Sequence, residues 1–156
     1  MKHIITYETL IHCNVENLFE FHADTANLPL ITPPDIDVDI IKISTPLKEG
    51  NEAQLKIKKW PFSFEWELLF EHVVYPELIV DVALRSPFKT FRHEHHFIEV
   101  DESYTLLKDV VTFSLPFGWF TLPFTWLIKR DMNKMFSYRH AKTKEFIARS
   151  RDSIQR

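Results

Sequence analysis

Two histidines separated by one residue, His93 and His95, are side chains that could move a proton near neutral pH, because imidazole titrates in that range. Residues 88–100 alternate as a strand does, and one face of that strand carries Phe91, His93, His95 and Phe97. The opposite face is charged and must meet water. Both histidines are therefore predicted to point into the protein interior.

An aspartate and an arginine are predicted to reach the same interior. In the following strand, Asp109 shares a face with apolar residues. Helical periodicity places Arg139 in the same narrow stripe as Met132 and Met135. An unpaired buried guanidinium is costly, so Asp109 is the natural partner for Arg139. Tyr138 and His140 flank Arg139 and are predicted to point away from this stripe.

Three interpretations of the cluster His93, His95, Asp109 and Arg139 stay open. In the first, an Arg139–Asp109 pair ties a helix to a sheet and has only a structural role. In the second, the cluster is the polar end of a ligand cavity. In the third, His93 or His95 is a general acid or base, with cyclase or dehydratase chemistry on a polyketide-like carbonyl.

Aromatic side chains supply the apolar surroundings of the cluster. The chain of 156 residues contains 14 Phe and 4 Trp, which suits either a dense core or the wall of an apolar cavity. The preferred hypothesis is a protein that binds or carries a small hydrophobic ligand, lipid-like or polyketide-like, and is not an enzyme. An interaction module with a filled core is a further alternative. The predicted cavity lining is Phe64, Trp66, Phe91, Phe97, Phe113, Met132 and Met135.

No cofactor or metal is expected from the sequence. His93, His95 and Asp109 match the ligand types of a zinc or iron site, but a fixed positive charge on Arg139 would repel a divalent ion. The chain has two glycines, which excludes a glycine-rich phosphate loop, and a single cysteine, Cys13, which excludes an internal disulfide and a cysteine zinc site.

Charge and hydropathy narrow the expected partners and location. The net charge of −3 offers no basic surplus to nucleic acid. Residues 110–128 lack charged side chains, but Pro116, Gly118 and Pro123 interrupt the stretch, so no transmembrane span is expected. The N-terminus carries no hydrophobic signal, and the cytoplasm is the predicted location.

The expected order of elements is one strand, two short helices, six strands and one long helix. Asn14 and Asp24 are predicted to cap the short helices, and the proline pair 33–34 ends the second. Short links between consecutive strands favour an antiparallel sheet. The expected strands cover residues 3–12, 36–40, 53–58, 62–72, 77–85, 88–100 and 104–115, and the long helix covers 123–150.

Four segments in this order resemble the START-related helix-grip superfamily, also called SRPBCC or polyketide-cyclase-like, and especially its small bacterial ligand-binding members. They are LPLITPP at 28–34, SPF at 86–88 with FRHEHHF at 91–97, KDVVTFSLPFG at 108–118, and MFSYRH at 135–140. The resemblance implies an α+β fold in which a curved antiparallel sheet of about seven strands grips a long C-terminal helix. It also implies one domain over residues 1–150 with a tail at 151–156. The superfamily includes carriers, hormone-binding proteins, cyclases and chaperone activators, so it does not fix the activity.

The apolar loop at 116–124 is predicted to lie between the last strand and the long helix. Its aromatic side chains allow four roles: a portal to the cavity, a homodimer contact, a shallow contact with a membrane, or packing beneath the short helices.

Overall fold

The computed structural model describes residues 1–154 and has the predicted order of elements. A first strand is followed by helix α1 (Val15–Ala23) and the 3-10 helix η1 (Thr25–Ile31). A second 3-10 helix, η2 (Gly118–Phe124), leads into the long helix α2 (Thr125–Ile154). The strands are β1 (Lys2–Ile11), β2 (Asp37–Ile43), β3 (Glu52–Lys59), β4 (Phe62–Val74), β5 (Leu78–Arg85), β6 (Thr90–Asp101) and β7 (Tyr104–Ser114).

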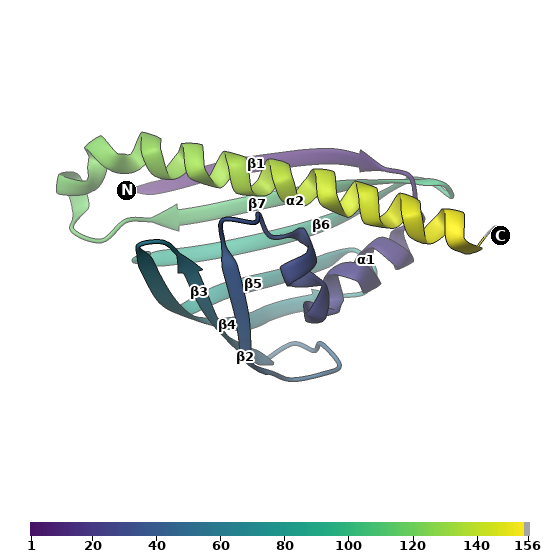
Figure 1. Cartoon of the computed structure of the whole chain (residues 1–156), viewed down its shortest axis with the longest axis horizontal. Coiled ribbons are helices and arrows are strands. Elements are labelled where there is room, and N and C mark those ends of the chain that lie inside the picture. Colours follow the sequence, from purple (N-terminus) through teal and green to yellow (C-terminus); the bar gives the residue numbers. More distant parts are fainter. Residues whose placement is uncertain (155–156) are drawn as a thin grey trace.

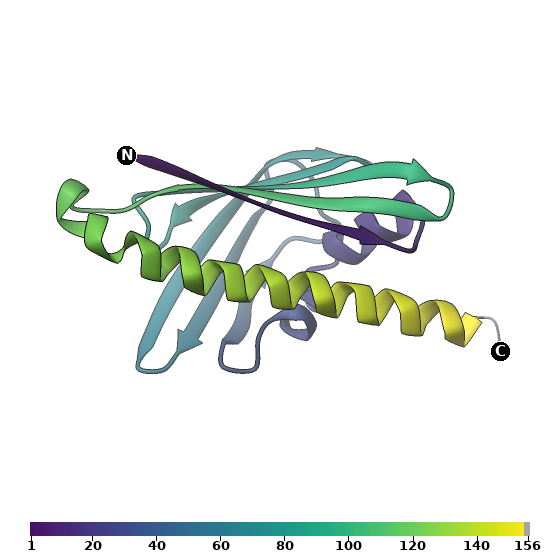
Figure 2. The same ribbon diagram turned by 90° about the horizontal axis from the view of Figure 1, so that it is seen from above.

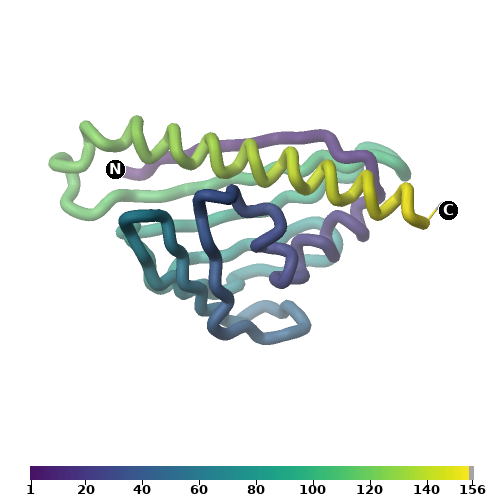
Figure 3. Tube along the Cα trace, viewed as in Figure 1, coloured from purple at the N-terminus to yellow at the C-terminus, as the bar shows by residue number. Residues whose placement is uncertain are grey.

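All seven strands form one antiparallel sheet in the order β1-β7-β6-β5-β4-β3-β2. Strands β2 to β7 are a meander, and β1 pairs with β7 at the far edge. Helix α2 runs along one face of the sheet close to β1, and the N-terminus lies at the same end of the molecule as η2 (Figures 1 and 2). The tube in Figure 3 follows the chain from β1 through the meander to this helix. The predicted α+β helix-grip architecture is confirmed.

The short helices begin where the sequence predicts. The Asn14 side chain accepts a hydrogen bond of 3.0 Å from the backbone N–H of Asn17, and the Asp24 side chain accepts one of 3.0 Å from Ala26. Both bonds satisfy N–H groups that have no partner within the first helical turn. Gly50 has φ +82°, which favours glycine at the turn before β3.

Two apolar clusters make up the core. One joins α1 to the sheet and includes Leu18, Phe97 and Leu107. The other joins α2 to the sheet and includes Phe113 and Phe136. The side chains that separate the two clusters along β6 and β7 are polar, because His93 and His95 lie between Phe91 and Phe97, and Asp109 lies between Leu107 and Val111.

The long helix and the loop before it differ from expectation. Helix α2 begins at Thr125 and extends to Ile154, so residues 151–154, predicted as a tail, continue the helix. Pro123 lies in η2 and not in the first turn of α2. No helix within residues 1–154 combines the length and apolar character that crossing a membrane requires.

The aromatic loop at 116–124 does not pack beneath the short helices. Phe117 is 81% exposed, Trp119 72% and Phe120 65%. Their rings therefore face solvent at the end of the molecule where α2 begins. Packing under α1 and η1 was the wrong alternative, and the roles as portal, homodimer contact or membrane contact stay predictions.

Burial protects the single cysteine. Cys13 follows β1, and burial raises the pKa of its thiol to about 11, although the nearby Arg151 acts in the opposite direction.

The thiolate is the reactive form, so iodoacetamide should modify Cys13 at pH 8 roughly 100-fold more slowly in the folded protein than in urea. Mass spectrometry of timed samples measures both rates. Equal rates in the two conditions would contradict this assignment.

Candidate functional site

Three imidazole rings surround the carboxylate of Asp109, which is only 3% exposed. Oxygen Oδ1 lies 2.9 Å from His93 Nε2 and 2.9 Å from His95 Nδ1, and the His95 contact is not aligned as a hydrogen bond. Oxygen Oδ2 lies 2.5 Å from His140 Nε2. The predicted meeting of His93, His95 and Asp109 in the interior is therefore present in the structure.

The strand register explains this meeting. His95 is directly opposite Asp109 across the β6–β7 pair, and Tyr7 is opposite Asp109 across the β1–β7 pair. His93 is two residues from His95 and hence on the same face. Antiparallel pairing holds all of these backbones at fixed separations, so the side chains converge without support from a flexible loop.

His140 was predicted to lie outside the cluster, and that prediction was wrong. It is 5% exposed, and besides Asp109 it contacts Thr9, whose Oγ1 lies 2.8 Å from His140 Nδ1. The buried stripe of α2 runs through Met132, Phe136, His140 and Thr143. From the sequence, the buried stripe was predicted to be centred on Arg139, one residue before His140. The two helix faces are hard to tell apart in the sequence, because methionine at 135 is as suitable for burial as phenylalanine at 136.

Arg139 does not form the predicted ion pair with Asp109. Among residues 1–154 no carboxylate oxygen lies within 4.0 Å of its guanidinium, and its buried Nε has no hydrogen-bond partner. The guanidinium carbon lies 5.6 Å from the centre of the Phe136 ring, a cation–π distance. Burial lowers the pKa of Arg139, and the charges of Asp109 and Asp81 oppose that shift. His140 takes the role of linking helix to sheet.

A second buried carboxylate, Asp81 on β5, was missed by the sequence analysis. It is 6% exposed, and its Oδ2 lies 3.4 Å from His95 Nε2 and 3.8 Å from His93 Nδ1. Register places Asp81 directly opposite His93. A signal was present, since Asp81 is the single charge in the run LIVDVAL at residues 78–84.

His22 on α1 is also close to the cluster and was not predicted. The centre of its ring is 5.8 Å from that of His95, and its Nδ1 lies 2.9 Å from the carbonyl oxygen of Leu18. Burial, together with the charge of His95, lowers the pKa of His22 to about 4. The ring is therefore neutral at pH 7.

The pKa values of the two neighbouring rings are shifted in opposite directions. Burial disfavours the charged form of His95, but Asp109 and Asp81 outweigh that effect and raise its pKa to about 9. Burial and the charge of His95 lower the pKa of His93. Burial alone would raise the pKa of Asp109, yet the charges of His95 and His93 and the bond from His140 hold it well below its usual value.

The predicted apolar lining is divided between core and partly exposed positions. Phe91, Phe113 and Met132 are buried in the α2 cluster, with Trp66 and Met135 packed against them. Phe97 is buried in the α1 cluster. Phe64 is partly exposed.

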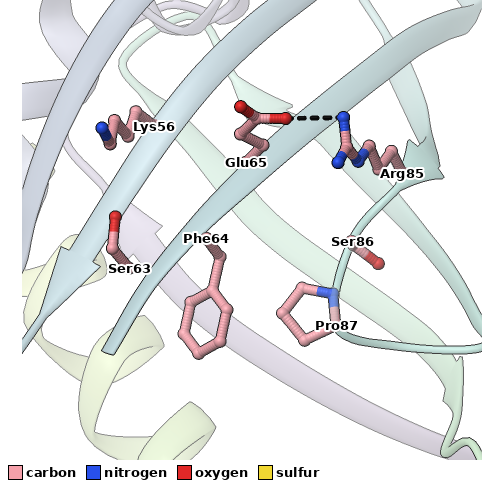
Figure 4. Close-up of a pocket in the computed structure, with 7 residues that line it drawn as sticks. All are labelled: Lys56, Ser63, Phe64, Glu65, Arg85, Ser86 and Pro87. Atoms are coloured by element: carbon pink, nitrogen blue, oxygen red, sulfur yellow. Dashed lines mark ion pairs between the residues drawn. The ribbon is translucent and has the colours of Figure 1, made fainter. Parts of the chain in front are cut away.

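Two hollows lie away from the polar cluster. The larger, about 510 Å³, is lined by Phe64, Glu65 and Arg85 among others, and Figure 4 shows the last two as an ion pair. Arg85 Nη1 lies 2.6 Å from Glu65 Oε2. The other, about 310 Å³, lies between residues 29–39 and Lys58. Neither has His93, His95, Asp109 or Arg139 in its wall, so the predicted cavity between sheet and helix is neither of these hollows.

This architecture, a seven-stranded antiparallel sheet with a long C-terminal helix along one face, is a helix-grip fold. No family model and no curated protein matches the sequence. Solved structures do match over nearly the whole chain. The protein TTHA0849 from Thermus thermophilus has a TM-score of 0.77 at 11% identity, covering 95% of this chain and 99% of that one.

Two structural neighbours carry names that describe an activity. The Zhui aromatase/cyclase from Streptomyces sp. R1128 has a TM-score of 0.77 at 13% identity, covering 96% of this chain and 95% of that one. Norcoclaurine synthase from Thalictrum flavum, a point mutant with a transition-state analogue, has a TM-score of 0.73 at 12% identity and covers 97% of both chains. At these identities the likeness establishes the fold alone.

Removing the charge of Asp109 should destabilise the protein strongly. Asp109→Asn leaves three buried rings without their shared anion, and we expect a loss of about 3–5 kcal/mol in the free energy of unfolding at pH 7. The pKa of Asp109 is depressed in the folded protein, so its contribution is present above the pKa of an unfolded aspartate, about 3.9. The difference between the two proteins should shrink as the pH falls below that value.

Urea unfolding followed by circular dichroism measures this difference. Asp39→Asn is the matched control, because Asp39 is exposed and pairs with Lys58 at 2.7 Å on the surface; it should change the unfolding midpoint little. A loss below about 1 kcal/mol in Asp109→Asn would show that the rings do not depend on the carboxylate.

Proposed function

We propose that this protein binds or carries a small hydrophobic molecule whose one polar end accepts hydrogen bonds, and that the molecule lies between the sheet and α2. The observation that carries the proposal is a pair of unsatisfied buried donors. Within residues 1–154, Arg139 Nε and Thr143 Oγ1 are buried and have no hydrogen-bond partner. Native proteins rarely leave such groups unpaired, so each needs an acceptor supplied from outside the chain.

The positions of these donors indicate one ligand group. Arg139 and Thr143 are four residues apart on α2, which places their side chains on the same side of the helix, one turn apart. A carboxylate, or a carbonyl with a neighbouring hydroxyl, offers acceptors at both positions. Arg139 is better suited than lysine for this purpose, because its planar guanidinium holds a carboxylate through two parallel bonds.

The surroundings favour an apolar body for the ligand. Trp66 contacts Phe91 edge-to-face, with ring centres 5.0 Å apart, and both pack in the cluster that joins α2 to the sheet. Among the structural neighbours, norcoclaurine synthase was solved with dopamine and hydroxybenzaldehyde, which are small aromatic molecules with polar groups. The combination of apolar walls and a few placed polar groups is typical of small-molecule sites.

An apolar fluorescent acid tests the proposal. We expect 8-anilinonaphthalene-1-sulfonate, which has aromatic rings and an anionic end, to bind the wild-type protein with enhanced fluorescence. Arg139→Met should weaken this binding roughly 10- to 100-fold, since a hydrogen bond to a charged group contributes about 1.5–3 kcal/mol. The variant should stay folded, because it replaces an unpaired buried cation by an apolar side chain of similar length.

The matched control is Arg149→Met on the same helix. Arg149 is exposed and interacts with Glu145, so its replacement should leave probe binding unchanged. Native mass spectrometry of protein purified from its own host would then reveal a natural ligand as additional mass that Arg139→Met lacks. Equal probe binding by wild type and Arg139→Met, or no binding by either, would overturn the proposal.

A further inference from the structure

His93 and His95 each lie between two buried carboxylates. The ring of His93 has Nε2 at 2.9 Å from Asp109 Oδ1 and Nδ1 at 3.8 Å from Asp81 Oδ2. The ring of His95 has the reverse orientation, with Nδ1 at 2.9 Å from Asp109 Oδ1 and Nε2 at 3.4 Å from Asp81 Oδ2. All four ring nitrogens therefore face an acceptor oxygen.

Protons alone leave at least one of these contacts unsatisfied, even when His95 carries both of its N–H groups. A neutral imidazole carries one N–H, so a ring that donates to Asp109 turns a lone pair towards Asp81. Two imidazolium rings would satisfy every oxygen, but the ring centres of His93 and His95 are only 3.8 Å apart, and two buried like charges at that distance repel strongly. A cation placed among the lone pairs and the Asp81 oxygen removes the conflict, because it accepts all three as ligands.

We propose that Asp81 Oδ2, His93 Nδ1 and His95 Nε2 bind a divalent first-row transition metal ion such as Zn²⁺, Fe²⁺ or Co²⁺. Each of the three residues offers one ligand atom, and these ligand atoms lie within 4.8 Å of one another. Metal bonds of about 2.0–2.1 Å in a tetrahedral site place ligand atoms roughly 3.3–3.5 Å apart. The two separations from Asp81 Oδ2, 3.4 and 3.8 Å, are close to that requirement.

Asp109 supports the proposed ligands and does not bind the ion itself. A histidine that binds a metal almost always donates its other N–H to a carboxylate or carbonyl, which fixes the tautomer and the ring orientation. Asp109 Oδ1 accepts that bond from His93 Nε2, and it lies 2.9 Å from His95 Nδ1, although that contact is not aligned as a hydrogen bond in this structure. Its other oxygen contacts His140, which Thr9 holds in turn, so the supporting carboxylate is itself fixed.

The backbone around the ligands is already in place. Asp81 and His93 are directly paired across β5 and β6, and His95 is on the same face of β6 as His93. Sites built on paired strands are held more precisely than sites built on loops. From the sequence, the ligand types of His93, His95 and Asp109 matched a metal site, but no metal was predicted; the structure groups Asp81, and not Asp109, with the two histidines.

The charge on Arg139 was the sequence argument against a metal, and the structure weakens it. Two carboxylates, Asp81 and Asp109, balance the two charges of the ion, and Arg139 forms no ion pair with either within residues 1–154. Three protein ligands leave at least one coordination position for water or another ligand, as in catalytic rather than structural zinc sites.

Cobalt spectroscopy tests the site in the full-length protein. After dialysis against a chelator, titration with Co²⁺ should produce visible absorption bands at one equivalent, without a thiolate charge-transfer band. Asp81→Asn should weaken Co²⁺ binding by more than tenfold, because loss of a supporting residue alone typically costs 10- to 100-fold. His72→Gln is the control: His72 is exposed and pairs with Glu49, and its removal should leave the titration unchanged.

Nuclear magnetic resonance on the wild-type protein locates the bound Co²⁺ without relying on a variant that could misfold. In amide-resolved NMR spectra, Co²⁺ should shift or broaden first the resonances of residues around 81, 93 and 95. Effects centred on His72 or His12, or a Co²⁺ affinity that Asp81→Asn retains, would overturn the metal site. The absence of any saturable binding would do the same. Probe binding through Arg139 is independent of this result.

Discussion

The interior of this protein is organised around one buried anion. Asp109 lies in the middle of the strand that pairs with both β1 and β6, and it is only 3% exposed. Such a group is stable only if its charge is compensated on the spot. Histidine rings from β6 and from α2 supply that compensation, so the charge of Asp109 holds the sheet and the long helix together.

The need to compensate the charge of Asp109 divides the buried polar groups into two sets: those that bind Asp109 and those that remain free to bind a ligand. His140 binds Asp109 from α2 and is held by Thr9 on β1, so the helix is joined to the sheet without using its arginine. Among the described residues, the buried atoms Arg139 Nε and Thr143 Oγ1 thereby have no hydrogen-bond partner. On the sheet side, Asp81 is a second carboxylate close to His93 and His95, the two rings that already contact Asp109. The proposed ligand site and the proposed metal site both use polar atoms whose hydrogen bonding or charge is not satisfied by Asp109 and its partners.

The layering of the core gives these groups their environment. Apolar residues of β6 and β7 extend to one cluster beneath α1 and to another beneath α2, with the polar side chains between them. Charge interactions within this polar layer are strong, because the apolar clusters on both sides of it have a low dielectric constant. The same surroundings suit a ligand that is apolar along its length and polar at one end.

The order of elements, the helix caps and the inward face of β6 and β7 could be predicted from the sequence, because alternation and capping are local properties of the chain. The shared interior of His93, His95 and Asp109 was predictable for the same reason. The partners of these side chains depend on how the elements pack. The rotation of α2 by one residue placed His140 and not Arg139 on Asp109, since several residues of α2 were equally suited to burial. The register of β5 against β6 placed Asp81 opposite His93, because pairing between strands is fixed by packing and turns, which a single strand's pattern does not encode.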